Sequence, residues 1–149
     1  MSSYFEELKR SMEYLGQDNK VIFLGQAVAD PGTAMSNTLK DVCSSKKLEL
    51  PVIEEMQRGI TNGLAVDGMI PVSIFPRWNF LLLAINQLVN HLDKIPEISS
   101  GGFLPKVIIR TGIGSERPLH PQCQHIGDFT ESIQSMCKNI EVIRLEETK

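Results

Sequence analysis

Residues 50–75, "LPVIEEMQRGITNGLAVDGMIPVSIF", indicate the fold class of this 149-residue chain. A short apolar run ends at two acids, Glu54 and Glu55; a helical pattern covers residues 54–66, and a second apolar run follows it. A strand, a helix and another strand in this order are typical of parallel strands joined by a crossover helix. The stretch therefore predicts an α/β unit, with the two acids where the first strand ends and the helix begins.

The rest of the chain continues this alternation. We expect helices over residues 4–15, 34–42, 54–66, 79–94 and 128–137, and strands over residues 20–25, 48–53, 68–75, 106–110 and 140–145. Strands that alternate with helices predict a doubly wound, mainly parallel sheet with helices on both faces. The length suits one domain over residues 1–149.

Charge and cysteine content exclude several classes of protein. The net charge is -3, with acidic and basic residues interleaved, so neither nucleic acid nor a membrane surface is an expected partner. Cys43, Cys123 and Cys137 are widely spaced and odd in number, which argues against a disulfide framework and against a C-x-x-C metal site. No apolar run is long enough to span a bilayer. We expect a cytoplasmic protein.

The two acids have two interpretations from the residues alone. Acids in the first turn of a helix complement its dipole and stabilise it by about 0.3–1 kcal/mol each. Alternatively, one of them is held at the carboxyl end of a strand for chemistry, because substrates bind there in this architecture. Gly59 and Gly63 on the same helix each cost about 1 kcal/mol relative to Ala, which predicts close packing against the sheet or against another subunit.

Other candidate sites are weaker. "RTGIGS" follows an expected strand but lacks the third glycine of a dinucleotide fingerprint, so we interpret it as a turn. His91 is expected to be a structural or interface residue. His120 and His125 lie in a long loop near Cys123, without a recognisable set of metal ligands. His120 stays a candidate because loops after strands bind substrates in such folds.

Residues 50–94 resemble the pyrimidine-binding domain of thiamine diphosphate-dependent enzymes. The similar proteins are the beta chains of 2-oxoacid dehydrogenase decarboxylating components and the central domain of transketolase. The residues that carry the resemblance, at matching spacing, are Pro51, Val52, Glu54, Gly59, Gly63, Gly68, Pro71, Phe75, Phe80, Gln87, Asn90 and Lys94. Weaker similarity extends through "VIFLGQAV" and "LHPQ" to "IEVIRL", so that nearly the whole chain is covered.

The resemblance implies a role for each matching residue. Glu54 would hydrogen-bond the pyrimidine ring of thiamine diphosphate at N1' and favour its imino tautomer, whereas Glu55 falls at a position without that role. Phe80 would stack on the ring, and Val52 and Pro76 would lie around it. His120, in "LHPQ", is similar to the loop histidine that faces the substrate.

Two departures from the family pattern limit what this chain can do alone. The family has an acid where this chain has Gln26, so proton exchange with a second active site is not expected. The 149 residues also lack a Gly-Asp-Gly motif followed by Asn, so we expect neither a diphosphate-binding domain nor a C-terminal transketolase-type domain. The resemblance therefore implies that a separate subunit holds the diphosphate and Mg²⁺, with no metal ligand in this chain. The apolar residues 79–94 are the expected packing surface.

We therefore expect the pyrimidine-binding subunit of a split, transketolase-like enzyme, a transferase or decarboxylase that acts on a ketose or 2-oxoacid carbonyl. It would be inactive alone and would assemble into a dimer or heterotetramer. The alternative is a non-catalytic assembly or regulatory protein that keeps the fold. Glu54 and Phe80 favour the enzyme, whereas Gln26 and the missing domain favour the alternative.

Overall fold

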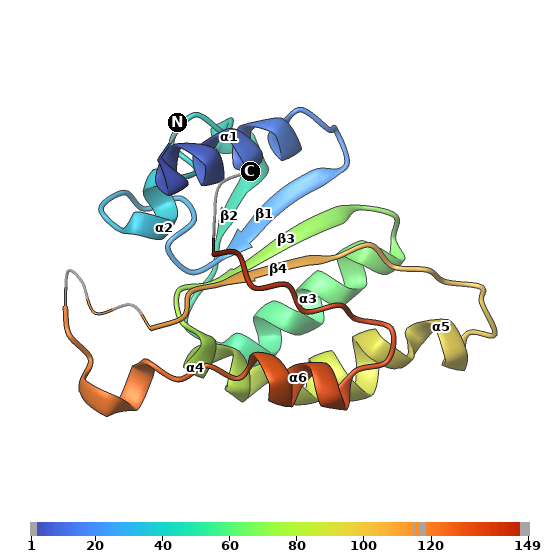
Figure 1. Cartoon of the computed structure of the whole chain (residues 1–149). Helices are drawn as coiled ribbons and strands as arrows, with labels where there is room; N and C mark the ends of the chain where they lie inside the picture. The colour runs from blue at the N-terminus through green and yellow to red at the C-terminus, as the bar shows by residue number, and fades with distance from the viewer. Residues whose placement is uncertain (1–2, 115, 117–118, 147–149) are drawn as a thin grey trace.

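Four parallel strands form one sheet, in the order β2-β1-β3-β4 (Figure 1). The computed structural model describes residues 3–114, 116 and 119–146. The strands are β1 (Val21–Gly25), β2 (Lys47–Glu49), β3 (Ile70–Phe75) and β4 (Ile108–Thr111). The register places Gly25, the last residue of β1, beside Glu49 of β2 and Ile74 of β3. The predicted parallel sheet is confirmed.

Helices cover both faces of the sheet (Figure 1). α1 (Tyr4–Gly16) and α2 (Ala34–Asn37) lie on one face, and α3 (Glu54–Val66), α4 (Trp78–Leu81), α5 (Ile95–Ile98) and α6 (Thr130–Met136) lie on the other. Shorter turns are η1 (Ser44–Lys46), η2 (Leu82–Ala84), η3 (Gln87–His91), η4 (Leu92–Lys94) and η5 (Gln122–His125). The doubly wound α/β fold is thus confirmed, although α2 is shorter than predicted.

Two apolar cores flank the sheet. Alternate residues of a strand point to opposite faces, so β3 contributes Val72 and Ile74 to one core and Phe75 to the other. The first core also contains Met12, Val21, Phe23, Val28, Leu39 and Val42. The second contains Trp78, Leu81, Ala84, Leu88, Leu92, Ile133 and Cys137.

Residues 79–94 do not form the single regular helix that we predicted. The path from α4 to α5 passes through a 3₁₀ turn, a five-residue π turn at Gln87–His91 and a second 3₁₀ turn. Asn62 of α3 donates its side-chain N–H to the carbonyl oxygen of Gln87, at 3.0 Å, where the π turn begins. A side chain that competes for a helix carbonyl in this way disturbs the regular ladder. In the described part of the chain, no helix has the length and apolar character needed to cross a membrane.

The predicted strand over residues 140–145 is absent. The side chain of Gln134 accepts a hydrogen bond from the backbone N–H of Val142 at 2.8 Å and donates one to the carbonyl of Ile140 at 3.2 Å. These are backbone groups that a fifth strand would use for pairing. The segment therefore runs as an irregular tail tied to α6, and the prediction of a fifth strand is wrong.

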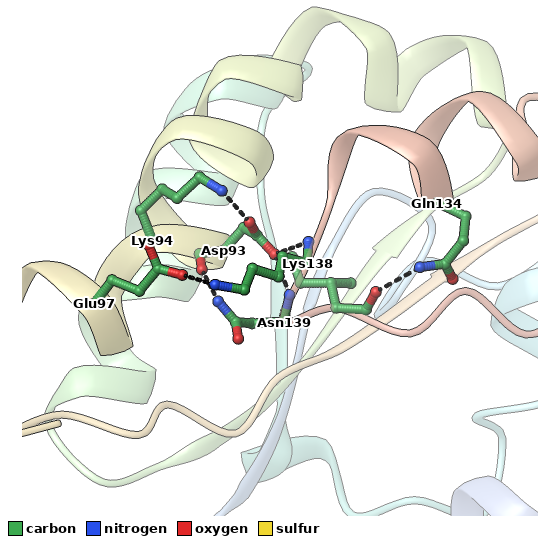
Figure 2. A network of polar contacts seen from close by, with 7 residues as sticks. Asp93, Lys94, Glu97, Gln134, Lys138 and Asn139 are labelled. Atoms are coloured by element: carbon green, nitrogen blue, oxygen red, sulfur yellow. Dashed lines mark hydrogen bonds and ion pairs between the residues drawn. The ribbon is translucent and has the colours of Figure 1, made fainter.

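The buried carboxylate of Asp93, in η4, connects η4 to the residues that follow α6 (Figure 2). Asp93 is fully buried, and its Oδ1 accepts hydrogen bonds from the backbone N–H groups of Lys138 at 2.9 Å and Asn139 at 2.7 Å. Its Oδ2 lies 2.7 Å from the ammonium group of Lys94. Burial alone would raise the pKa of Asp93, but these hydrogen bonds outweigh it, and the pKa lies below its usual value.

Asp93 should make the stability of the chain depend on acid pH. Because its pKa is lower in the folded state than in the unfolded state, its contribution is present above pH ~4 and is lost as the pH falls through the folded-state pKa. We expect Asp93→Asn to lower the free energy of unfolding at pH 7 by about 1–3 kcal/mol and to flatten its decline below pH ~5. Urea unfolding at a series of pH values measures both effects.

Glu97→Gln is the matched control for this prediction. Glu97 forms an exposed ion pair with Lys138 at 2.8 Å, and exposed pairs contribute little. Its loss should therefore change stability only slightly. An equal pH slope in wild type and Asp93→Asn would contradict the role given to Asp93.

Candidate functional site

Glu54 lies at the carboxyl edge of the sheet, where the chain passes from β2 into α3. It is the first residue of α3 and only 5% exposed. The helix is held on β3 by buried polar groups: Gln57 donates to Ser73 Oγ at 3.1 Å and to the carbonyl of Ile74 at 2.9 Å, and Thr61 shares a hydrogen bond with Ser73. This anchoring fixes the start of α3, and with it Glu54, relative to the strand ends.

Gln26 is the neighbour of Glu54 across the edge. It follows β1 directly, is buried, and donates its side-chain N–H to Glu54 Oε1 at 3.3 Å. The position where the related enzymes are expected to have an acid therefore does contact the predicted catalytic carboxylate. Since an amide cannot exchange a proton with a carboxylate at neutral pH, Gln26 acts here as a hydrogen-bond donor.

Phe80, the predicted stacking residue, has a histidine against its ring. The ring centroids of Phe80 and His125 are 5.1 Å apart, with an interplanar angle of 56°. Arg77 donates from Nη1 to the backbone carbonyl of His125 at 3.2 Å, which ties the long loop to the start of α4. His125 Nδ1 is buried without a hydrogen-bond partner in the described part of the chain. Sequence reasoning noted His125 but assigned it no role, because contact with Phe80 is visible only in three dimensions.

The other predicted site residues lie at the surface of the same region. His120 is exposed; its Nδ1 accepts a hydrogen bond from the backbone N–H of Gln122 at 3.0 Å, and its Nε2 lies 3.7 Å from Glu116. Val52 is 73% exposed and Pro76 is half-buried. The interactions described for His120 are with its own loop, so its role toward substrate stays a prediction.

Exposed apolar side chains occur on the elements around Glu54, and two of these elements, α3 and η2, contact each other. These side chains come from the connection before α3, from α3 itself and from η2: Val52, Ile53, Met56, Leu82 and Leu83. Gly59 and Gly63 also face outward, and a Cβ added at either position would meet nothing within 4 Å. Close packing on the sheet, one of the two explanations predicted for these glycines, is therefore wrong.

Arg58 of α3 is a buried cation that sequence reasoning missed. It is fully buried, and its Nη2 donates to Asn62 Oδ1 at 3.1 Å, but Nε and Nη1 have no partner among the described residues. Burial lowers the pKa of Arg58 to about 10, so the side chain stays charged at neutral pH. No sequence pattern marks this residue, since its burial depends on how α3 packs against η2 and η3.

Replacing Arg58 by Met should stabilise the chain. A buried charge without a counter-charge is costly, and apolar side chains of similar volume at such sites leave stability unchanged or raise it by roughly 1–4 kcal/mol. Thermal and urea unfolding of Arg58→Met would measure the change. The control is Arg10→Met, at an exposed arginine of α1, which should leave the midpoint nearly unchanged. A lower midpoint for Arg58→Met would contradict this prediction.

The donor set at this edge suits the pyrimidine half of thiamine diphosphate. One buried carboxylate, one half-exposed aromatic ring and an apolar surround could hold a flat heterocycle with a polar ring nitrogen. Residues 3–114, 116 and 119–146 contain no group of three or more His, Cys, Asp or Glu side chains placed to hold a metal ion.

Comparison with known proteins finds beta subunits of the pyruvate dehydrogenase E1 component among the relatives of this chain. The beta subunit of the pyruvate dehydrogenase E1 component of Cyanidium caldarium is 31% identical over 123 residues, which cover 78% of this chain and 37% of the relative. The mitochondrial beta subunit of Drosophila melanogaster is 30% identical over 115 residues, or 73% of this chain and 32% of the relative. The mitochondrial beta subunit of Ascaris suum is 27% identical over 141 residues, which cover 93% of this chain and 36% of the relative. No family model matches the chain.

Proposed function

We propose that this chain is the pyrimidine-binding subunit of a split thiamine diphosphate-dependent enzyme, because its homologues are pyruvate dehydrogenase E1 beta subunits. The chain spans about a third of the length of these relatives. The observation that carries the proposal is Glu54, buried at the carboxyl edge of a parallel sheet and hydrogen-bonded to Gln26. The names of the relatives favour a 2-oxoacid substrate over a ketose.

Three groups of this chain divide the work. Thiamine diphosphate, when bound, supplies the nucleophilic carbon that attacks a substrate carbonyl. Glu54 would hold a proton at N1' of the pyrimidine, and Gln26 would keep the carboxylate in place from one side. Phe80 would orient the ring, and the apolar side chains nearby would exclude water, which would strengthen the hydrogen bond to Glu54.

A second subunit completes the site. It would bind the diphosphate and Mg²⁺, and it would cover the apolar surface of Val52, Ile53, Met56, Leu82 and Leu83. The outward glycines of α3 leave room for its backbone to approach closely. Activity would then require the assembly, in which pairs of subunits form a dimer or heterotetramer. A cytoplasmic location stays a prediction, and some of the relatives are mitochondrial.

Co-purification from the native host tests this function. The tagged chain is isolated, the co-purifying proteins are identified by mass spectrometry, and bound thiamine diphosphate is assayed. We expect a stoichiometric companion with Gly-Asp-Gly and a downstream Asn, and cofactor retained only when both are present. Reconstitution with that companion and Mg²⁺ should then turn over a 2-oxoacid.

The alternative is a non-catalytic assembly or regulatory protein. Gln26 at the position of the family's acid is the observation that favours it. If the chain were isolated without a companion and without cofactor, this alternative would replace the enzyme, and Glu54 would be an acid that stabilises the start of α3.

A further inference from the structure

Glu49, the last residue of β2, holds the loop that follows β1. Its carboxylate accepts hydrogen bonds from three successive backbone N–H groups: those of Ala27 at 2.8 Å, Val28 at 2.7 Å and Ala29 at 2.7 Å. Hydrogen bonds from N–H groups to an ionised carboxylate are short and roughly twice as strong as neutral ones. The parallel register brings this about, since it sets Glu49 beside Gly25 at the point where β1 ends.

The turn that Glu49 holds is strained. Ala27 has a φ of 56°, in the left-handed region that residues with a Cβ seldom adopt. Gly25 has a φ of 136° in a place where a Cβ would come within 2.2 Å of the carbonyl oxygen of Ile74. Such a conformation persists only where surrounding contacts enforce it. Here the three hydrogen bonds to Glu49 hold the backbone of Ala27 and of the two residues after it.

Gln26 is the residue directly before this strained turn. This residue lies between Gly25 and Ala27, is buried, and donates to Glu54 Oε1. A relaxed φ at Ala27 would rotate the peptide group that joins Gln26 to Ala27 relative to the rest of the loop, so the loop could no longer follow its present path from Gln26 to Glu49.

We propose that Glu49 is a positioning residue: it enforces the turn at Ala27 and thereby sets Gln26 against Glu54. The functional importance of this arrangement rests on the proposed function, in which Glu54 acts on the cofactor. The contacts themselves belong to this chain alone. Glu49 thus acts through Gln26 and needs no contact with cofactor or substrate.

Glu49→Gln in the full 149-residue chain tests the proposal. The new side chain has a single acceptor oxygen and no charge, so we expect the backbone amides of Ala27, Val28 and Ala29 to exchange with deuterium at least about tenfold faster. The second readout is the side-chain NH₂ signal of Gln26 in a ¹⁵N NMR spectrum, recorded with and without the substitution Glu54→Ala, which removes the acceptor of its hydrogen bond. Glu54→Ala should shift this signal in the wild-type background, and in the Glu49→Gln background at least half of this response should disappear.

Two further variants complete the test. Glu55→Gln makes the same substitution at an exposed position of α3 and should change neither readout. Glu49→Asp keeps the charge with a shorter side chain and should give intermediate exchange, which keeps the test available if Glu49→Gln fails to fold.

The outcomes separate this proposal from the proposed function. Unchanged exchange at Ala27, Val28 and Ala29 would overturn the role of Glu49. Faster exchange with an unchanged Gln26 response would also overturn it, because Glu49 would then only stabilise the loop. If both readouts change as expected but the wild-type assembly binds no thiamine diphosphate, Glu49 positions Gln26 while the proposed function fails.

Discussion

Glu54→Gln is expected to leave the chain folded and to lower turnover of the reconstituted assembly by about two to four orders of magnitude. The replacement has the same shape and can still accept the hydrogen bond that Gln26 donates at 3.3 Å. It cannot take up or release a proton near neutral pH, so it cannot hold one at the pyrimidine nitrogen. Steady-state turnover at saturating cofactor, together with thermal unfolding of the free chain, measures the two expectations separately.

Glu55→Gln is the matched control, because Glu55 is the next residue of the same helix turn and is exposed. It removes an acid from the first turn of α3 without touching the site, so turnover should remain at the wild-type level. Normal turnover in Glu54→Gln would show that the assigned mechanism is wrong. Equal losses in both variants would indicate that charge at the start of α3, and not the proton of Glu54, is what matters.

Gly25→Ala should be among the most destabilising single substitutions in the chain. The added Cβ would lie 2.2 Å from the carbonyl oxygen of Ile74 and 2.6 Å from Nε2 of Gln57, and the backbone there has a φ of 136°. Both the neighbouring strand and α3 would have to move. Strain and overpacking together predict a loss of roughly 2–6 kcal/mol in the free energy of unfolding. Urea denaturation measures it.

Gly59→Ala provides the comparison for this prediction. Gly59 lies in the interior of α3, and an added Cβ would meet nothing within 4 Å. Alanine is about 1 kcal/mol better than glycine in such a position, so the free chain should become more stable. A small effect of Gly25→Ala, or destabilisation by Gly59→Ala, would show that the backbone around these residues differs from the one described.

The local patterns of the chain predicted most of the fold. The helix over residues 54–66 has the predicted bounds, and the strands near residues 20–25 and 68–75 were found within one or two residues. Such elements follow from the spacing of apolar residues a few positions apart. The tail over residues 140–145 has the apolar and β-branched composition of a strand, but the side chain of Gln134 binds its backbone. This competition for the backbone arises from a tertiary contact, so the sequence of residues 140–145 does not reveal it.

The candidate site was predictable only in part, for the same reason. Glu54 and Phe80 were predicted as site residues because their spacing matches a known pattern, and that pattern also marked Gln26. The contact of Gln26 with Glu54, the three backbone amides on Glu49 and the ring of His125 against Phe80 join segments 20–45 residues apart. The alternation of strands and helices follows from the spacing of apolar residues within each segment, which the sequence shows directly. Which side chains meet at the carboxyl edge follows from strand register and helix packing, which arise only when the whole chain has folded.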